Sequence, residues 1–106
     1  MRIETFGKGV EVTPAMQEYV DTKLQRIHKH FDQHCEIRVT LELRKNEHHA
    51  DASAKIPGQT LHAEAGGENI YAAIDVLADK LDRLVVKHKE KKQQHAPGVP
   101  ISDNGV

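Results

Sequence analysis

The feature that most constrains the fold is an unbroken alternation of apolar and polar side chains over residues 35–44. Apolar side chains, beginning with Cys35, occupy the odd positions, and charged residues or Thr40 occupy the even positions. Successive side chains of a β-strand point to opposite faces, so the segment is predicted to be a strand with one buried side. Such a strand belongs in a sheet whose other face remains in contact with solvent.

Three weaker alternations predict the other strands. They cover residues 2–6, 49–56 and 61–65. Gly7-Lys8-Gly9 is expected to break the first of these strands, and Gly66-Gly67 to end the last. Turns are predicted at Lys45-Asn46-Glu47 and at Pro57-Gly58. The apolar positions of residues 49–56 are mainly alanine, whose small side chain would let a helix lie close to the sheet.

Two segments have the periodicity of amphipathic helices. The first begins at Thr13-Pro14, because threonine suits the N-cap and proline the first helical position, and it is expected to end near Phe31. Its apolar positions are Met16, Tyr19, Val20, Leu24, Ile27 and Phe31. The second covers residues 68–92, with Asn69 or a neighbour as its cap. Its apolar positions are Ile70, Ile74, Leu77, Leu81 and Leu84.

The predicted order of elements is β-α-β-β-β-α, which is an α+β fold. A strand, a crossover helix and another strand favour a parallel pair, and the next two connections are short enough for antiparallel hairpins. We therefore expect one four-stranded sheet with two helices packed on one face. A chain of 106 residues fits one domain, at residues 1–95, and residues 96–106 are expected to be a flexible tail.

The net charge of −1 hides a basic segment. Residues 80–92 contain six Lys or Arg and two acidic residues, a local charge of +4. Each predicted helix places its bases to one side of its apolar stripe and its acids farther round. The bases of the first helix are Lys23, Arg26, Lys29 and His30, and those of the second include Lys80, Arg83, Lys87 and Lys91. Charges sorted in this way, rather than interleaved as i,i+4 pairs, predict a polyanionic partner.

No enzyme, cofactor or membrane span is predicted. Gly7-Lys8-Gly9 lacks the further glycine of a nucleotide loop, and no acid/base pair stands out. Cys35 and His34 would point to opposite faces, so Cys35 is expected in the core. No closed metal-ligand set accompanies the histidines near the end of the first helix, where the helix dipole favours them. The start is unlike a signal peptide and no apolar run approaches roughly 18 residues, so we expect a cytoplasmic protein.

The positions of the aromatic residues indicate which kind of RNA the protein would bind. Proteins that read single-stranded RNA on a sheet usually stack bases on exposed aromatic side chains. We expect the aromatic side chains here to lie in the core or at its flank, and the polar strand faces to carry none. Phosphate contacts with folded RNA are therefore predicted rather than base stacking.

Several motifs together resemble one protein family. They are Val10-Glu11-Val12-Thr13-Pro14-Ala15 with Tyr19-Val20, Phe31-Asp32, Asp51-Ala52, Asn69-Ile70-Tyr71-Ala72-Ala73-Ile74-Asp75, Asp79-Lys80-Leu81 and Lys87-His88-Lys89. Over about residues 1–95, the chain resembles the bacterial ribosome hibernation factors, and their short members most closely. Asn69 stands where the family usually has Asp, and Leu84-Val85 stands where Gln-Leu is common.

The resemblance implies a fold similar to double-stranded RNA-binding domains and binding to the small ribosomal subunit. Members lie across the decoding region against 16S rRNA, at the A and P sites, and silence translation in stationary phase. Short members promote inactive ribosome dimers together with a separate ribosome modulation factor, and we expect a monomer off the ribosome. The rRNA contacts implied are Lys23, Arg26, Lys29, Lys80, Arg83, Lys87, Lys89 and Lys91.

Three alternatives stay open. The first is the sister ribosome-associated inhibitor, which blocks the same site without promoting dimers. Its tail is longer and acidic, whereas residues 96–106 here carry one acid, Asp103, so the dimer-promoting type is favoured. The second is a protein-binding regulator, consistent with modulation of a sigma factor. The third is a metal-binding domain that uses the histidines.

Overall fold

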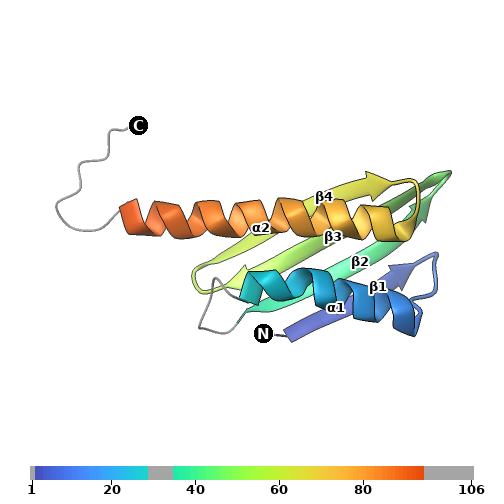
Figure 1. Ribbon diagram of the computed structural model, residues 1–106, viewed down its shortest axis with the longest axis horizontal. Coiled ribbons are helices and arrows are strands. Elements are labelled where there is room, and N and C mark those ends of the chain that lie inside the picture. Colours follow the sequence, from blue (N-terminus) through green and yellow to red (C-terminus); the bar gives the residue numbers. More distant parts are fainter. Residues whose placement is uncertain (1, 29–34, 95–106) are drawn as a thin grey trace.

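Four strands form one sheet in the order β1-β2-β3-β4, and two helices cover one of its faces (Figure 1). The computed structural model describes residues 2–28 and 35–94, with only the backbone at residues 28 and 90–94. The elements are β1 Arg2–Lys8, α1 Pro14–His28, β2 Glu36–Arg44, β3 Glu47–Ile56, β4 Gln59–Gly67 and α2 Ile70–Gln94. This order confirms the predicted β-α-β-β-β-α arrangement.

The strand pairing also agrees with the prediction. β1 and β2 are parallel, and β2–β3 and β3–β4 are antiparallel. One row of side chains that faces the helices shows the register: Val39 of β2 lies between Thr5 and Ala52, and Ala52 pairs with Ala63 of β4. The alternation over residues 35–44 therefore divides a covered face from an open face. The exception is Leu43 near the end of β2, which was expected to be buried and is 45% exposed.

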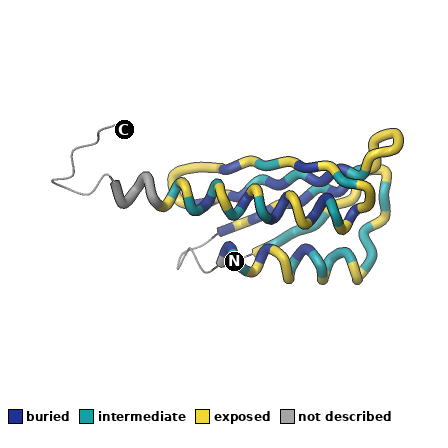
Figure 2. The backbone as a smooth tube through the Cα atoms, turned by 45° about the horizontal axis from the view of Figure 1, so that its top comes forward, coloured by how far each residue is buried: buried dark blue, intermediate teal, exposed yellow. Residues whose placement is uncertain are grey.

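The core lies between the covered face of the sheet and the two helices. α2 packs on β3 and β4, and α1 packs beside α2. The largest fully buried side chains come from β2 and from both helices: Val20, Leu24, Ile27, Ile37, Val39, Leu41, Ile74, Leu77, Leu81 and Val85. Figure 2 shows burial alternating along the strands and recurring along each helix. The alanines of β3 are also buried, which lets α2 approach the sheet closely.

Cys35 lies in this core, as predicted. Its side chain is 2% exposed. Burial raises the pKa of its thiol, because a charged thiolate would lose its hydration. The residue therefore behaves as a small apolar group.

Both helices begin at the predicted caps. The Thr13 hydroxyl accepts a hydrogen bond from the Met16 amide at 3.1 Å, and the Asn69 carbonyl Oδ1 accepts one from the Ala72 amide at 2.9 Å. The predicted end of the first helix near Phe31 lies outside the described residues, as does the predicted tail at residues 96–106. Figure 1 shows the last turns of α2 extending beyond the end of the sheet.

One of the two predicted strand ends at glycines was wrong. β1 continues through Gly7 to Lys8, because the pairing with β2 is maintained there, whereas β4 ends at Gly67, as predicted. Gly67 is also where β4 meets α2 closely, since an added Cβ would lie 2.8 Å from the Ala73 nitrogen. The predicted turn at Pro57-Gly58 is confirmed, with Gly58 at a φ of 83°.

Candidate nucleic-acid interface

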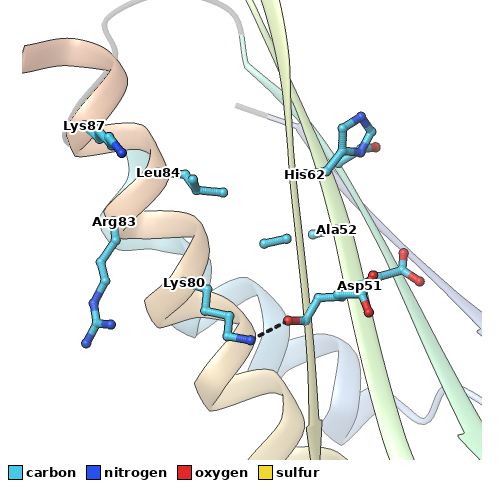
Figure 3. Close-up of a pocket in the computed structure, with 10 residues that line it drawn as sticks. Asp51, Ala52, His62, Lys80, Arg83, Leu84 and Lys87 are labelled. Atoms are coloured by element: carbon cyan, nitrogen blue, oxygen red, sulfur yellow. Dashed lines mark hydrogen bonds between the residues drawn. The ribbon is translucent and has the colours of Figure 1, made fainter. Parts of the chain in front are cut away.

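A groove separates the basic side of α2 from β4, the edge strand of the sheet. Its volume is about 580 Å³. We call it the α2/β4 groove, and it is lined by Asp51, Ala52, Ser53, His62, Ala63, Glu64, Lys80, Arg83, Leu84 and Lys87 (Figure 3). Three of the predicted rRNA contacts, Lys80, Arg83 and Lys87, therefore lie on one wall of a single depression.

The opposite wall is formed mainly by alanine and by backbone. Ala52 and Ala63 face α2, whereas the side chains of Asp51 and His62 point away from the helix (Figure 3). Leu84 reaches from α2 toward the strands and, like Ala63, is partly exposed. The groove therefore has an apolar floor beneath a basic rim.

Lys80 joins the two walls of the groove. Its ammonium Nζ donates a hydrogen bond to the backbone carbonyl oxygen of Glu64 at 3.0 Å. Arg83 points away from the strands (Figure 3). Lys87 makes no hydrogen bond or ion pair with the side chains and backbone that the structure describes.

Arg83 also takes part in a bridge between the helices. Its Nη2 lies 2.8 Å from Oδ2 of Asp79, and Nη2 of Arg26 on α1 lies 3.3 Å from Oδ1 of the same carboxylate. The Asp79 carboxylate therefore pairs with one guanidinium from each helix. All three side chains are between 42% and 78% exposed, so the bridge is accessible to solvent and contributes little stability.

A second bridge lies further toward the start of α2. The Tyr19 hydroxyl donates a hydrogen bond to Asp75 at 2.7 Å, and the Lys23 ammonium lies 3.2 Å from the same oxygen. The Tyr19 hydrogen bond, with a further contribution from Lys23, lowers the pKa of Asp75. The Asp75 hydrogen bond in turn raises the pKa of Lys23 and that of Tyr19. The Tyr19 ring also meets Tyr71 edge to face, with centroids 5.0 Å apart.

The predicted segregation of charge was wrong for part of this surface. Arg83 and Asp79 form an i,i+4 pair within α2, where the acids and bases of each helix were expected on different faces. Asp75 and Asp79 also face α1 and pair with its bases Lys23 and Arg26. The periodicity of one helix could not reveal this, because the rotation of each helix about its axis is fixed only when the two pack together.

The predicted contacts are therefore divided between two neighbouring depressions. Lys23 and Arg26 line a shallow cleft of about 350 Å³ between α1 and α2, together with Asp75, Val76, Ala78 and Asp79. Lys80, Arg83 and Lys87 line the α2/β4 groove. Lys89 is exposed farther along α2. Lys29 lies outside the described residues, and of Lys91 only the helical backbone is described.

Sequence reasoning missed three features of the structure. Leu84 packs against the core, as its place in the apolar stripe predicted, but it also lines the groove, which the sequence did not indicate. Phe6 is 48% exposed on the open face of the sheet, so the expectation that the polar strand faces carry no aromatic residue was wrong. His49 is only 6% exposed on that face, with Nε2 3.9 Å from Glu64. The alternation of residues 2–6 already placed Phe6 on the polar side, which was the available signal.

Comparison with known proteins identifies the family. Residues 3–93 match the family described as Sigma 54 modulation protein / S30EA ribosomal protein. The chain belongs to this family. It is 43% identical over 98 residues to the ribosome hibernation promoting factor of Pseudomonas putida, covering 92% of this chain and 96% of that protein. It is 40% identical over 95 residues to that of Escherichia coli K12, covering 90% of this chain and 100% of that protein.

Two solved structures of this kind have the same fold. The N-terminal domain of Thermus thermophilus Protein Y superposes with a TM-score of 0.78 at 30% identity, covering 83% of this chain and 99% of that one. A ribosomal subunit interface protein from Coxiella burnetii gives a TM-score of 0.75 at 33% identity, covering 85% and 99%. The resemblance to ribosome hibernation factors and the predicted fold are both confirmed. Within the described residues, neither helix is long and apolar enough to cross a membrane.

Proposed function

We propose that this protein is a ribosome hibernation factor that binds the small ribosomal subunit at the decoding region. There it contacts 16S rRNA across the A and P sites, inhibits translation, and promotes inactive ribosome dimers in stationary phase. The names of its relatives, ribosome hibernation promoting factor and ribosomal subunit interface protein, support this role. The protein acts in the cytoplasm as a monomer when it is off the ribosome.

The observation that supports rRNA binding most strongly is the row of cations along α2. Lys80, Arg83 and Lys87 recur at i, i+3 and i+7 on one side of the helix, and they share one groove. Side chains three or four residues apart on a helix lie about 5–6 Å from one another, a spacing that suits successive phosphates of a nucleic acid strand. Lys89 lies two residues beyond Lys87 and therefore on another side of α2. Lys89, Lys29 and Lys91 complete the proposed contact set.

The bridges to acids are compatible with this role. Arg26, Arg83 and Lys23 are partly neutralised by Asp79 and Asp75 in the free protein. Ion pairs between exposed side chains are worth about 0–1 kcal/mol, so an RNA phosphate can replace the carboxylate at little cost.

The test is co-sedimentation with small ribosomal subunits over a range of salt concentrations. The double variant Arg83→Ala, Lys87→Ala should bind more weakly, and its log–log salt slope should fall by about 1.5, because each phosphate contact contributes roughly 0.7–0.9. Arg38→Ala with Lys55→Ala removes two cations from the open face of the sheet and serves as the matched control. Equal binding by both double variants at every salt concentration would contradict the assignment.

Dimer promotion is tested separately. A sucrose gradient of ribosomes with this protein and the ribosome modulation factor should contain a dimer peak that is absent when either one is omitted. A protein that blocks translation without forming this peak would be the ribosome-associated inhibitor type instead.

A protein-binding regulator is the second candidate, because the family description includes sigma 54 modulation. Pull-down from a lysate with and without nuclease separates the two roles. Captured ribosomal subunits should be lost after nuclease treatment if rRNA is the partner, whereas a protein regulator would keep its partner.

A further inference from the structure

The α2/β4 groove opens on backbone groups that no strand pairs with. β4 is the last strand of the sheet, and only β3 lies beside it. Pro57-Gly58 is a two-residue hairpin turn, so the residues on either side of it, Ile56 and Gln59, form a hydrogen-bonded pair. Along β3 and β4, pairs with and without such hydrogen bonds then alternate. His62 and Glu64 belong to the pairs without these hydrogen bonds, so their backbone N–H and C=O groups point away from β3. The Lys80 hydrogen bond to the Glu64 carbonyl agrees with this direction.

The same groove offers apolar surface. Ala63 of β4 and Leu84 of α2 face each other across it, and both are only partly buried. A larger residue in place of Ala63 would occupy the space that the groove now provides. The floor is therefore an uncovered part of the same face that elsewhere forms the core.

The rim of the groove adds positive charge. Lys87 lies one turn beyond Leu84 and has no partner among the described residues, and Arg83 is 78% exposed. The carboxylates of Asp51 and Glu64 come from strand positions whose side chains lie on the open face of the sheet. Because these carboxylates lie on the other side of the sheet, the charged groups that remain within the groove are mainly basic.

These three properties are those that a single nucleotide requires. A nucleobase has two apolar faces and an edge of hydrogen-bond donors and acceptors, and its phosphate carries negative charge. The volume of about 580 Å³ lies within the range of roughly 300–1,000 Å³ that is typical of small-molecule sites. A base in a duplex could not use the groove, because its edge is already paired and its faces are stacked.

We propose that the α2/β4 groove receives one unpaired nucleotide of an RNA strand. The base packs between Ala63 and Leu84, and its phosphate contacts Lys87. The edge of the base hydrogen-bonds to the backbone of His62 and to the amide N–H of Glu64, whose carbonyl keeps the Lys80 hydrogen bond. The inference rests on the proposed function in assigning α2 an RNA partner, and it adds a contact to a base where the sequence alone predicted contacts to phosphates.

The test compares two oligomers of equal charge with the full chain. One is an oligouridylate, and the other is an abasic ribose-phosphate oligomer of the same length. Fluorescence anisotropy should give at least about fivefold tighter binding for the oligouridylate, the lower end of what a buried base contributes in single-strand binding. Ala63→Leu should remove this difference by filling the groove, whereas Lys87→Ala should weaken the binding of both oligomers.

A second measurement does not depend on a folded variant. In NMR spectra of the unaltered protein, uridine monophosphate should shift the His62 and Glu64 amides and the Leu84 methyl groups, and ribose 5-phosphate should not. Equal affinity for the two oligomers would overturn the nucleotide site, and so would an acidic peptide that shifts these signals where the nucleotide does not. Either result leaves the proposed function standing if binding to small subunits still depends on Arg83 and Lys87, so the two failures are distinguishable.

Discussion

Arg26 of α1 and Asp79 of α2 are 53 residues apart in the sequence, and their side chains meet at 3.3 Å. The same carboxylate holds Arg83 at 2.8 Å, so one acidic residue sets the positions of two basic residues of the proposed interface. An RNA phosphate must compete with this carboxylate for both guanidinium groups. The strength of RNA binding should therefore depend on Asp79 as well as on the bases.

Asp79→Asn is expected to strengthen binding to small subunits several-fold at moderate salt. The amide keeps the shape of the side chain but removes a negative charge beside Arg26 and Arg83, so less competition remains. Co-sedimentation measures the effect, and Glu36→Gln on the open face of the sheet is a control with the same change in net charge. Weaker binding by Asp79→Asn would mean instead that the carboxylate is needed to position the arginines.

Tyr19→Phe should destabilise the protein near neutral pH and have less effect in acid. The Tyr19 hydrogen bond lowers the pKa of Asp75 below its ordinary value of 3.8. A carboxyl group with a lowered pKa in the folded state contributes stability above its unfolded pKa, and this stability is lost as the pH falls through the folded value. Urea unfolding of both proteins at pH 7 and near pH 2.5 should therefore give a smaller difference in acid. A difference that is the same at both pH values would argue against the bridge.

Leu81→Ala and Leu84→Ala separate the core from the groove. Leu81 is fully buried, and its truncation should cost about 2–5 kcal/mol of unfolding free energy through lost burial and a cavity. Leu84 is partly exposed, so its truncation should cost much less. Urea denaturation gives both values, and similar losses would show that Leu84 is a core residue and that the groove floor is closed in solution.

Gly67→Ala should destabilise the fold by about 1–3 kcal/mol, as overpacking usually does. The new methyl group would lie 2.8 Å from the backbone nitrogen of Ala73, where neither β4 nor the first turn of α2 can move easily. Gly66→Ala is the matched control, because the atoms nearest to its methyl group would be those of the Glu47 carboxylate, at the end of a flexible side chain. Equal thermal midpoints for the two variants would contradict this account of the β4–α2 junction.

Much of the fold follows from local patterns in the sequence. The alternation over residues 35–44 determines which side of β2 is buried, and Thr13 and Asn69 form the helix caps that their side chains favour. The end of β1 does not follow from local pattern, because Gly7 continues as strand when a paired neighbour supplies the hydrogen bonds. Propensity is a weak guide wherever such pairing is available.

The candidate site was predictable only as a set of charges. The bases of α2 could be read from the sequence, whereas the pairing of Lys23 with Asp75 depends on the packing angle between two helices. The groove arises because Ala63 is too small to fill the space between β4 and Leu84. Neither the alternation of β4 nor the helical periodicity of α2 indicates that this groove is present.

The hydrogen bond from Lys80 to the Glu64 carbonyl also bears on how the free protein avoids aggregation. Edge strands with unpaired backbone groups can pair with the edge of another molecule and begin a growing assembly, and a lysine on the edge is a common protection. Lys80 places a hydrated positive charge across the middle of β4. Two molecules approaching edge to edge would each have to displace this ammonium group and would bring like charges together. The lysine at the centre of the proposed RNA surface should therefore also oppose edge-to-edge pairing of two molecules when no RNA is bound.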